Sequence, residues 1–455
     1  MQNSDTPSAK PGPAATSFLS RRERFLAQIG NGVAILVASP ELLKSRDTDV
    51  RYRANSDLLY LTDFAEPETV AVFTPHDPEH RLTLFVRPRD AEKETWTGRR
   101  HGVEGARDRF GADAAYPLDE LDERLPKLLE PADAVWYSLG SSQEMDRRVT
   151  SLLARFRLSR PRSGKGPWDV RDPAQVLDPM RLVKEPAELE LMRESGRLAA
   201  QGHLAAMRMA RPGVGEWELE AAVDGTYRRA GAWGPSYPTI VGSAVNGTIL
   251  HYTSNDRVVE DGDLVLIDAG AELGNYCSDI TRTFPVNGRF TPAQRALYDV
   301  VAAAEEAGIA AVAPGNTFQG VHDAAVRVMV KGLADLGLLP RGDVDALIED
   351  GGYKRFNTHQ TSHWLGLDVH DAGGYREPDG SPLRLRPGMV LTVEPGLYIP
   401  DAEDIPADFR GLGIRVEDDV IVTETGREVI TRDVPVDADE IEATVGSGVM
   451  ETAGR

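Results

Sequence analysis

Two segments in the second half of the chain, 262–270 and 388–396, align with each other without a gap. They read GDLVLIDAG and GMVLTVEPG, so that glycine matches glycine at both ends and Asp268 falls opposite Glu394. Each is an apolar run of the kind that forms a buried strand, and each ends in a carboxylate that is costly to bury without a partner. The repeat predicts two duplicated halves that deliver acids to one shared place, although two buried strands can also match by chance.

The first of these strands continues into a predicted hairpin. The Gly-Asn pair at 274–275 suits a two-residue turn, because both residue types tolerate positive φ. Symmetric pairing about that turn places Asp268 opposite Thr281. It also places Asp279 opposite Gly270, whose missing side chain would leave room for an ion. The two aspartates would then be diagonal neighbours, roughly 7–8 Å apart, and would repel each other unless cations neutralise them. The alternative is a surface hairpin with solvated acids.

Two further segments carry residues of the same kind. In GLGIRVEDDVIV, Arg415 and Glu417 share a strand face, so that the guanidinium can orient the acid or screen its neighbours, while Asp418 points toward solvent or another partner. The stretch HQTSHWLGLDVHD supplies three of the nine histidines: His359, His363 and His370. Four carboxylates and an imidazole form a hard donor set that suits Mn²⁺ and also admits Co²⁺, Zn²⁺ or Fe²⁺.

Composition argues against several classes of function. The 72 acidic and 51 basic residues give a formal charge of −21, which disfavours nucleic-acid binding because that requires a basic surface. No apolar run approaches the roughly 20 residues that cross a bilayer, and the start of the chain has no secretory signal, so we expect no membrane attachment. The single cysteine, Cys277, fits a reducing cytoplasm and is expected to pack rather than to bind metal.

Composition also predicts the domain organisation. Apolar runs such as VAILVAS and LTLFVRP alternate with helical stretches in the first part of the chain, which indicates an α/β domain. A segment rich in Pro, Gly and Arg follows it and is expected to be a linker, after which Pro186 marks the first turn of a predicted helix. The predicted boundaries are a disordered tail at 1–16, a first domain at 17–158, a linker at 159–178, a second domain at 179–445 and a tail at 446–455.

The motifs of both parts resemble one family. The matching stretches are YPTIVGS, ILHYT, DGDLVLIDAG, SDITRTFPVNG, SHWLGLDVHD, PGMVLTVEPGLYI and GIRVEDDV, with RANSDLLYLTDFAEPE and ETWTGRR in the first half. They resemble the aminopeptidase P group of the pita-bread metallopeptidases over about residues 17–445. The resemblance implies a mixed α/β (α+β) protein, with a creatinase-like N-terminal α/β domain and a C-terminal pita-bread domain of pseudo-twofold symmetry, consistent with the repeat.

The resemblance also implies roles for individual residues. Two divalent ions, most simply Mn²⁺, would be bridged by Asp279 and Glu417, with Asp268 on one ion and His363 and Glu394 on the other. The implied catalytic residues are His251, His359, His370, Glu394 and Arg415. The implied substrate-binding residues are Asp57, Trp96, Tyr237, Gln360 and Tyr398. Of these, Asp57 and Trp96 would reach the site of a neighbouring subunit in a homodimer or homotetramer; a helix cap for Asp57 and ordinary burial for Trp96 are the alternatives.

The activity implied is hydrolysis of peptide bonds next to proline, with release of the N-terminal residue from Xaa-Pro peptides. Gln360 departs from the glycine usual in this group, and its amide could bind a substrate carboxylate. A Xaa-Pro dipeptidase and a Xaa-Pro carboxypeptidase are therefore the alternatives. A catalytically inactive peptide-binding module and a metal-free creatinase-type hydrolase are more remote, because all five ligand positions are filled. The loop AGGYREPDGSPLRLRPG is longer than usual, so the family's arginine there is not assigned between Arg376 and Arg384.

Overall fold

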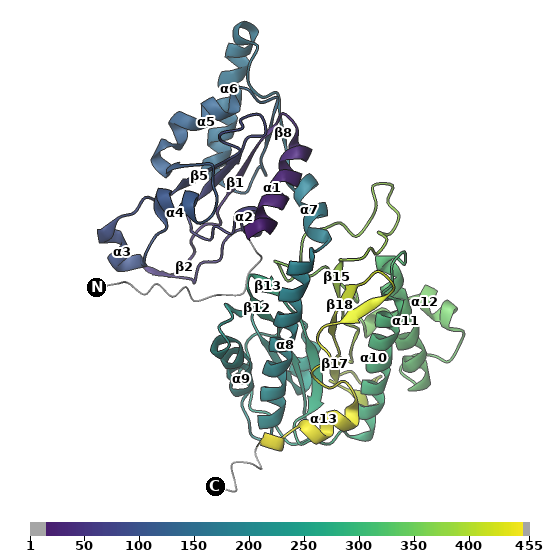
Figure 1. Ribbon diagram of the computed structural model, residues 1–455. Helices are drawn as coiled ribbons and strands as arrows, with labels where there is room; N and C mark the ends of the chain where they lie inside the picture. The colour runs from purple at the N-terminus through teal and green to yellow at the C-terminus, as the bar shows by residue number, and fades with distance from the viewer. Residues whose placement is uncertain (1–14, 449–455) are drawn as a thin grey trace. The chain divides into compact units, whose positions relative to one another are not determined.

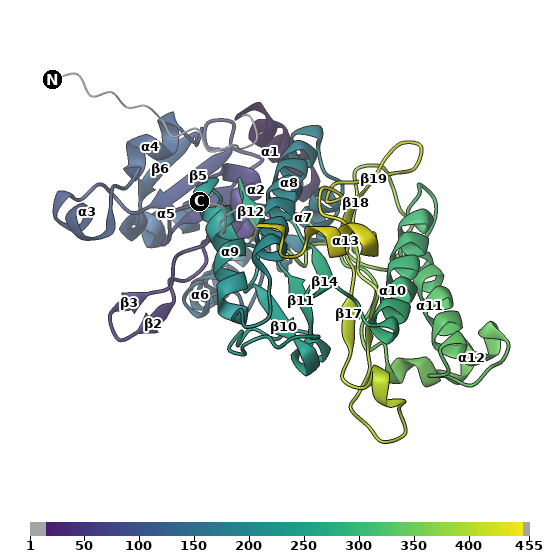
Figure 2. The same ribbon diagram turned by 90° about the horizontal axis from the view of Figure 1, so that it is seen from below.

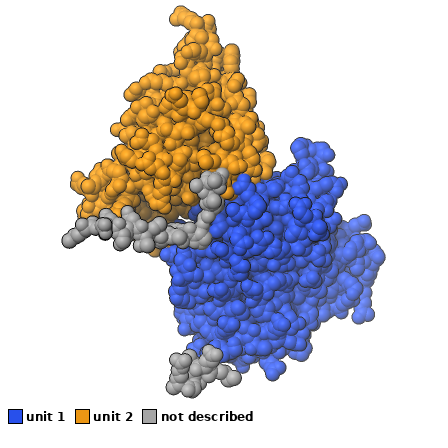
Figure 3. All heavy atoms as spheres, in the orientation of Figure 1, with its two compact units in different colours: residues 1–12, 181–455 blue, residues 13–180 orange. Residues whose placement is uncertain are grey.

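The computed structural model describes residues 15–448. Within them the chain forms two compact units, one ending at Met180 and the other beginning at Arg181 (Figures 1 and 3). The tails predicted at 1–16 and 446–455 lie outside the described residues, apart from 15–16, which belong to α1 (Ala15–Ile29), and 446–448, which follow α13 (Ala438–Thr444).

The segment predicted as a linker differs from that expectation, because much of it is regular structure. Helix α6 (Gln143–Ser163) extends into it, strand β8 (Asp169–Arg171) pairs in parallel with β7 (Ala134–Trp136), and α7 (Ala174–Leu182) follows. Its Gly content has a local cause: Gly164 ends α6 in the left-handed conformation, with φ 69°. The chain can therefore turn directly from the helix into an edge strand.

The first unit is an α/β domain built on a mixed sheet of six strands in the order β6-β5-β4-β1-β7-β8. The apolar runs noted above form β1 and β5, and α5 and α6 contribute leucine, valine and methionine side chains to the core on the sheet. The other strands are β1 (Val33–Val37), β4 (Val70–Phe73), β5 (Leu82–Val86), β6 (Ala114–Pro117) and the hairpin β2 (Leu43–Ser45) with β3 (Thr48–Asp49). The other helices are α2 (Ser56–Thr62), α3 (Ala91–Thr97), α4 (Gly102–Asp108) and α5 (Leu121–Leu129).

The second unit consists of two halves of similar build, as the repeat predicts, with the short helix α12 (Val344–Asp350) additional in the second half. Each half starts with two helices and continues into antiparallel strands, and Figure 2 shows the strands between the two helix pairs. The first half contains α8 (Pro186–Met209), α9 (Glu216–Arg229), β9 (Gly234–Pro235), β10 (Ile240–Ser243), β11 (Leu264–Asp268), β12 (Ala271–Leu273), β13 (Tyr276–Cys277) and β14 (Thr281–Pro285). The second contains α10 (Pro292–Ala311), α11 (Phe318–Asp335), α12 (Val344–Asp350), β15 (Val390–Val393), β16 (Gly396–Tyr398), β17 (Gly413–Arg415), β18 (Asp418–Val422) and β19 (Arg427–Val429).

The two halves also begin in the same way. Proline occupies the first turn of both α8 and α10, and each helix carries a capping box at its N-terminus. The repeated segments 262–270 and 388–396 contain β11 and β15, which pair with β14 and β18 respectively. One continuous apolar core joins side chains of both halves, so the two acidic strand ends are held in one body. Among the described residues, no helix is both long and apolar enough to cross a membrane.

Candidate metal centre and active site

The hairpin forms with the predicted register. Gly274 and Asn275 have φ of 58° and 73°, as a two-residue turn with positive φ at both positions requires. Asp268 lies opposite Thr281, which confirms the predicted pairing. Gly270 was expected to leave room for an ion, but the structure gives another reason for a glycine here. A Cβ at this position would lie 1.6 Å from the backbone oxygen of Ser278. The glycine permits two backbone segments to approach, rather than leaving space for an ion.

The two aspartates of the hairpin share one hydrogen-bonding partner. The Tyr237 hydroxyl lies 2.5 Å from Asp268 Oδ1 and also within hydrogen-bonding distance of Asp279 Oδ1. Asp279 is held from behind as well, because its backbone N–H donates to the buried carboxylate of Asp419 at 3.0 Å. Tyr237 was predicted to bind substrate. Its two hydrogen-bonding contacts also hold the two acids in place.

Glu417 approaches the hairpin from the second half of the unit. The Thr281 hydroxyl donates to Glu417 Oε2 at 2.6 Å, and the backbones of the two residues form a bridge. Arg415 donates from Nε to this hydroxyl at 3.0 Å and from Nη2 to Asp268 at 2.5 Å. The guanidinium thus contacts one acid directly and the other through a threonine. Asp418 is not directed to solvent: it is fully buried against Arg282, with N···O 2.9 Å.

His363 and Glu394 complete the group of five. His363 Nε2 lies 3.6 Å from Asp279 Oδ2 and 3.6 Å from Glu394 Oε1. Its other nitrogen, Nδ1, lies 3.0 Å from the carbonyl oxygen of Trp364. Because a carbonyl only accepts, Nδ1 carries a hydrogen, and in the neutral imidazole Nε2 presents its lone pair to the acids, which is the arrangement of a metal-binding imidazole.

The electrostatics of this group fit bound cations. Ligand atoms of Asp279, His363 and Glu417 all lie within 4.8 Å of one another, and the three side chains belong to both halves. Burial, together with the neighbouring acids, raises the pKa of Asp279 and Glu417 above the ordinary range, and burial raises the pKa of Glu394 to about 7. Burial alone would lower the pKa of His363, but the adjoining Asp279 and Glu394 raise it to about 9. Divalent cations would neutralise the negative charge that these buried acids carry when ionised, and carboxylate and imidazole donors suit such cations.

Three more of the predicted histidines surround the group. His359 Nε2 lies 2.8 Å from the Tyr398 hydroxyl, and its Nδ1 lies 3.7 Å from Glu394 Oε2; burial lowers the pKa of His359 to about 4. The ring of His370 stands edge-on to that of His363, with the ring centres 4.4 Å apart. His251 lies in the loop after β10 and lines the same cavity.

The cavity in front of these residues has a volume of about 630 Å³, large enough for a short peptide. Eleven of the predicted site residues line it: Tyr237, His251, Asp268, Asp279, His359, Gln360, His363, His370, Glu394, Arg415 and Glu417. Tyr398 is buried behind this wall, where its hydroxyl meets Arg415 Nη1 at 2.7 Å. The structure therefore brings eleven residues predicted from the sequence to one cavity, which Pro238, Ile240, Leu250, Thr253, Ser362, Val369 and Tyr375 also line.

Asp57 and Trp96 belong to the other unit, and their role remains a prediction. Asp57 is in the first turn of α2, but the residue that caps this helix is Asn55, whose side chain accepts from the Leu58 N–H. Trp96 lies on α3 and is 85% exposed, so ordinary burial, the alternative weighed for it, is wrong. Cys277 is buried, as expected of a packing residue.

Sequence reasoning missed the residues that support the five predicted ligands. The sequence predicted only the strand register of Thr281, and it predicted no role for Asp419 or Asp371. Asp419 could have been found, because it lies two residues after Glu417 and alternation places the two on one face. The contact of Thr281 with Glu417 gives no local signal, because the two residues are far apart in the sequence.

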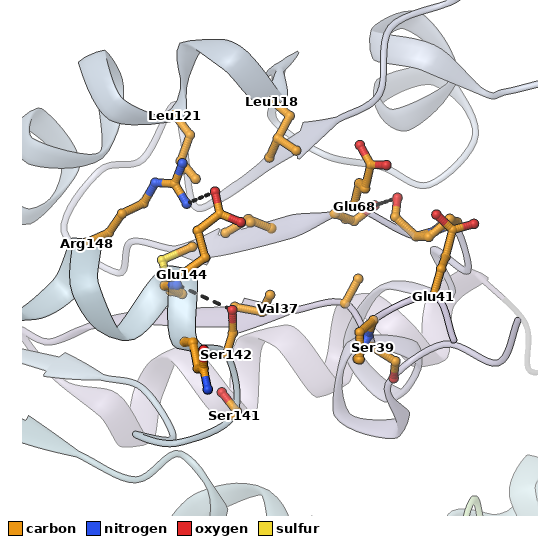
Figure 4. A pocket seen from close by; sticks show the side chains of 17 residues that line it. Val37, Ser39, Glu41, Glu68, Leu118, Leu121, Ser141, Ser142, Glu144 and Arg148 are labelled. Carbon is orange, nitrogen blue, oxygen red and sulfur yellow. Dashed lines mark hydrogen bonds and ion pairs between the residues drawn. The ribbon is translucent and has the colours of Figure 1, made fainter. Parts of the chain in front are cut away.

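The first unit has a hollow of its own, of about 380 Å³, between the end of β1 and the start of α6 (Figure 4). Ser142 caps α6 there, and the two long charged side chains beside it, Glu144 and Arg148, pair with each other at 2.6 Å. The carboxylates of Glu41 and Glu68 also line it. The five-residue group that suits divalent cations lies in the second unit.

Comparison with known proteins agrees with this fold. The model of metallopeptidase family M24 matches residues 190–424, and that of the aminopeptidase P N-terminal domain matches residues 18–136. The chain belongs to metallopeptidase family M24. Within that family it resembles aminopeptidase P: it is 46% identical over 429 residues to the Xaa-Pro aminopeptidase of Escherichia coli strain K12, covering 94% of this chain and 96% of that one.

More distant relatives and solved structures extend the likeness. The Xaa-Pro aminopeptidase 3 of Mus musculus is 33% identical, over 95% of this chain and 86% of its own. The structure of Pseudomonas aeruginosa aminopeptidase PepP superposes with a TM-score of 0.93 at 43% identity, covering 97% of this chain and all of that one (100%). Zn-substituted E. coli aminopeptidase P in complex with product gives a TM-score of 0.91 at 43% identity, covering 96% and 99%. Both units are covered, which supports the predicted two-domain architecture.

Proposed function

We propose that this protein is a metallo-aminopeptidase that releases the N-terminal residue from peptides with proline in the second position. The observation that carries this is the set of five residues, four acids and a histidine, gathered around one cavity in an M24 fold. The relatives named above are Xaa-Pro aminopeptidases and share both units with this chain. Proline matters because a bond to its nitrogen lacks the N–H that many peptidases require.

The five residues would hold two divalent ions, with Asp279 and Glu417 shared between them. Asp268 would bind one ion, and His363 with Glu394 the other. The oxygen-rich donors favour Mn²⁺, and the same set admits Zn²⁺, Co²⁺ or Fe²⁺. When bound, such ions supply an activated water and polarise the scissile carbonyl.

The side chains around the ions would carry out the proton transfers and the positioning. Glu394 would take a proton from the attacking water and return it to the leaving proline nitrogen. His370 would donate a hydrogen bond to the substrate carbonyl, and His251 would position the substrate. Arg415 orients Asp268 through its 2.5 Å contact. His359, held by Tyr398, would lie beside the residue after the scissile bond.

Gln360 bears on where along a peptide the enzyme cuts. Its side chain is exposed at the cavity wall, where an amide can donate a hydrogen bond to a substrate C-terminal carboxylate. This would favour short peptides, and it is the reason to keep a Xaa-Pro dipeptidase or carboxypeptidase as the second candidate. Asp57 and Trp96 would complete the site of a neighbouring subunit in a homodimer or homotetramer, and we place the protein in the cytoplasm.

A panel of peptides tests the proposal. With Mn²⁺ present, we expect Xaa-Pro-Yaa peptides to lose their first residue, proline-free controls to remain intact, and peptides with a blocked N-terminus to resist cleavage. Mass spectrometry of the products gives the position of the cut. Loss of a C-terminal proline from blocked peptides would show a carboxypeptidase, and cleavage of Xaa-Pro dipeptides alone would show a dipeptidase.

A further inference from the structure

The loop 363–370 is closed by one residue, Asp371, whose carboxylate is buried. This side chain is 1% exposed, and the Asp371 backbone N–H donates to the carbonyl oxygen of Trp364 at 3.0 Å, which joins the two ends of the loop. Its Oδ1 accepts from Arg181 Nη2 at 2.5 Å, and its Oδ2 accepts from Lys184 Nζ at 3.0 Å. Both carboxylate oxygens are thus engaged by cations from outside the loop.

The loop folds around this carboxylate. A Cβ at Gly366 would lie 2.1 Å from Asp371 Oδ2 and 3.0 Å from Lys184 Cε, so glycine is required where the carboxylate passes. The Gly366 carbonyl accepts from the Cys277 N–H at 2.8 Å, which ties the loop to the hairpin that carries Asp279. We call the cluster of Asp371, Arg181 and Lys184 the anchor. The anchor occupies the space that a side chain at position 366 would fill.

The anchor carries full charges in a dry environment. The side chains of Arg181 and Lys184 are 6% and 1% exposed. Burial would raise the pKa of Asp371, but the two cations hold that pKa below its usual range. Separating the partners of a buried ion pair would leave each charge uncompensated, which costs much free energy. The three side chains are therefore held in one arrangement.

We propose that Asp371 is a positioning residue which, with Arg181 and Lys184, fixes the backbone that aims His370 at the substrate. The proposal rests on the proposed function, in which His370 contacts the scissile carbonyl. The His370 side chain is exposed to the cavity, so its direction depends on the backbone next to it. His363 is held separately, because its N–H and carbonyl bond to Thr392 at 3.1 and 3.0 Å. Loss of the anchor should displace His370 more than the metal ligand.

A double-mutant cycle tests this. Asp371→Asn should lower kcat/KM on a Xaa-Pro-Yaa peptide by about 10–100-fold at saturating Mn²⁺, as loss of a supporting contact does in other sites. In the His370→Ala background the same change should cost less than about twofold, because the residue through which it acts is gone. If the fold losses of kcat/KM caused by Asp371→Asn and His370→Ala multiply in the double variant, the proposal is overturned.

Asp368→Asn is the matched control, since Asp368 also contacts Arg181, at 2.7 Å, but its side chain is 42% exposed. It should keep kcat/KM within about twofold of the starting protein, in line with an exposed ion pair. An equal loss in both variants would contradict a special role for Asp371. If Asp371→Asn does not fold, Asp371→Asn with Lys184→Met removes one charge of each sign and enters the same cycle.

A crystal structure of the Asp371→Asn variant gives a readout that does not depend on activity. We expect the His370 ring to leave its edge-on contact with His363 while the Asp279–Glu417 region is unchanged. An unmoved ring would overturn the proposal. If the starting protein cleaves no Xaa-Pro peptide, the proposed function fails, and the crystal structure still decides whether Asp371 positions His370.

Discussion

At the scale of single residues, the site is dominated by acids that face one another in a buried cavity. Type and spacing in the sequence were enough to select Asp268, Asp279 and Glu394, because an apolar strand that ends in an acid is unusual enough to need a reason. The partners of these acids could not be selected in this way. Tyr237 and Thr281 are common residue types, and their contacts are set by the packing of distant segments.

The raised pKa values predict how the stability of the metal-free protein depends on pH. Glu394 has a pKa of about 7 and His363 of about 9 in the folded chain, both above the ordinary values of 4.5 and 6.5. Between pH 6.5 and 9 the folded chain therefore holds protons that the unfolded chain has released, so stability falls as the pH rises. His203 and His359, with pKa values of about 4 in the folded chain, are protonated only in the unfolded chain near pH 6.5, where they oppose the trend; above about pH 7.5 they are neutral in both states and contribute nothing.

Thermal melts with a chelator should show this as a Tm that decreases from about pH 7 to 9. The Mn²⁺-loaded protein should change less, because bound cations keep the acids charged and the imidazole neutral. Glu394→Gln should flatten the part of the trend around pH 7. A chelated protein whose Tm rises over this range would contradict the assignment of these groups.

At the scale of elements, local turn chemistry made the β11–β14 hairpin predictable, including its register. The Gly274–Asn275 turn fixes the pairing, and alternation then places the aspartates on one face. The contact between β14 and the strand end at Glu417 was beyond sequence reasoning, because no turn connects the two segments. The second helix pair and β15 were predictable only through their likeness to the first half. The segment 159–178 was predicted to be a linker, but much of it is helix and strand. Gly and Pro residues occur in tight turns as often as in irregular segments, so they do not distinguish the two.

Gly270→Ala tests the close approach within the hairpin. Its Cβ would meet the Ser278 carbonyl, a backbone atom that cannot rotate away, so the strands must separate beside Asp268 and Asp279. We expect a loss of about 1–3 kcal/mol in the free energy of unfolding and weaker Mn²⁺ binding, measured by denaturant titration and calorimetry. Gly426→Ala is the control, because a Cβ there meets nothing within 4 Å. Unchanged metal affinity in Gly270→Ala would show that the approach is not required by the site.

At the scale of the whole molecule, the chain consists of two units with separate cores (Figure 3), and the five predicted ligands belong to one of them. Composition predicted this division, since an α/β pattern of short apolar runs precedes the repeat. The role of Asp57 and Trp96 could not be judged in this way, because it depends on a partner subunit and not on the fold of one chain.

Separate cores predict two unfolding transitions, of which divalent cations shift one. At a free Mn²⁺ concentration one hundred times Kd, the unit with the ligands should gain about 2.7 kcal/mol, while the transition of the first unit stays in place. Differential scanning calorimetry with and without chelator measures this. His363→Ala serves as the control and should abolish the shift. Movement of both transitions by the same amount would contradict the independence of the two units.

The duplicated architecture has a consequence for how the enzyme matures. Asp279 comes from the first half and Glu417 is among the last residues of the second half to be synthesised. With the proposed ligand set, neither half alone would hold both ions, so hydrolytic activity would arise only after the whole catalytic unit has been translated and its two halves have packed together. A nascent or truncated chain would then be unable to cut peptides before its cavity is complete.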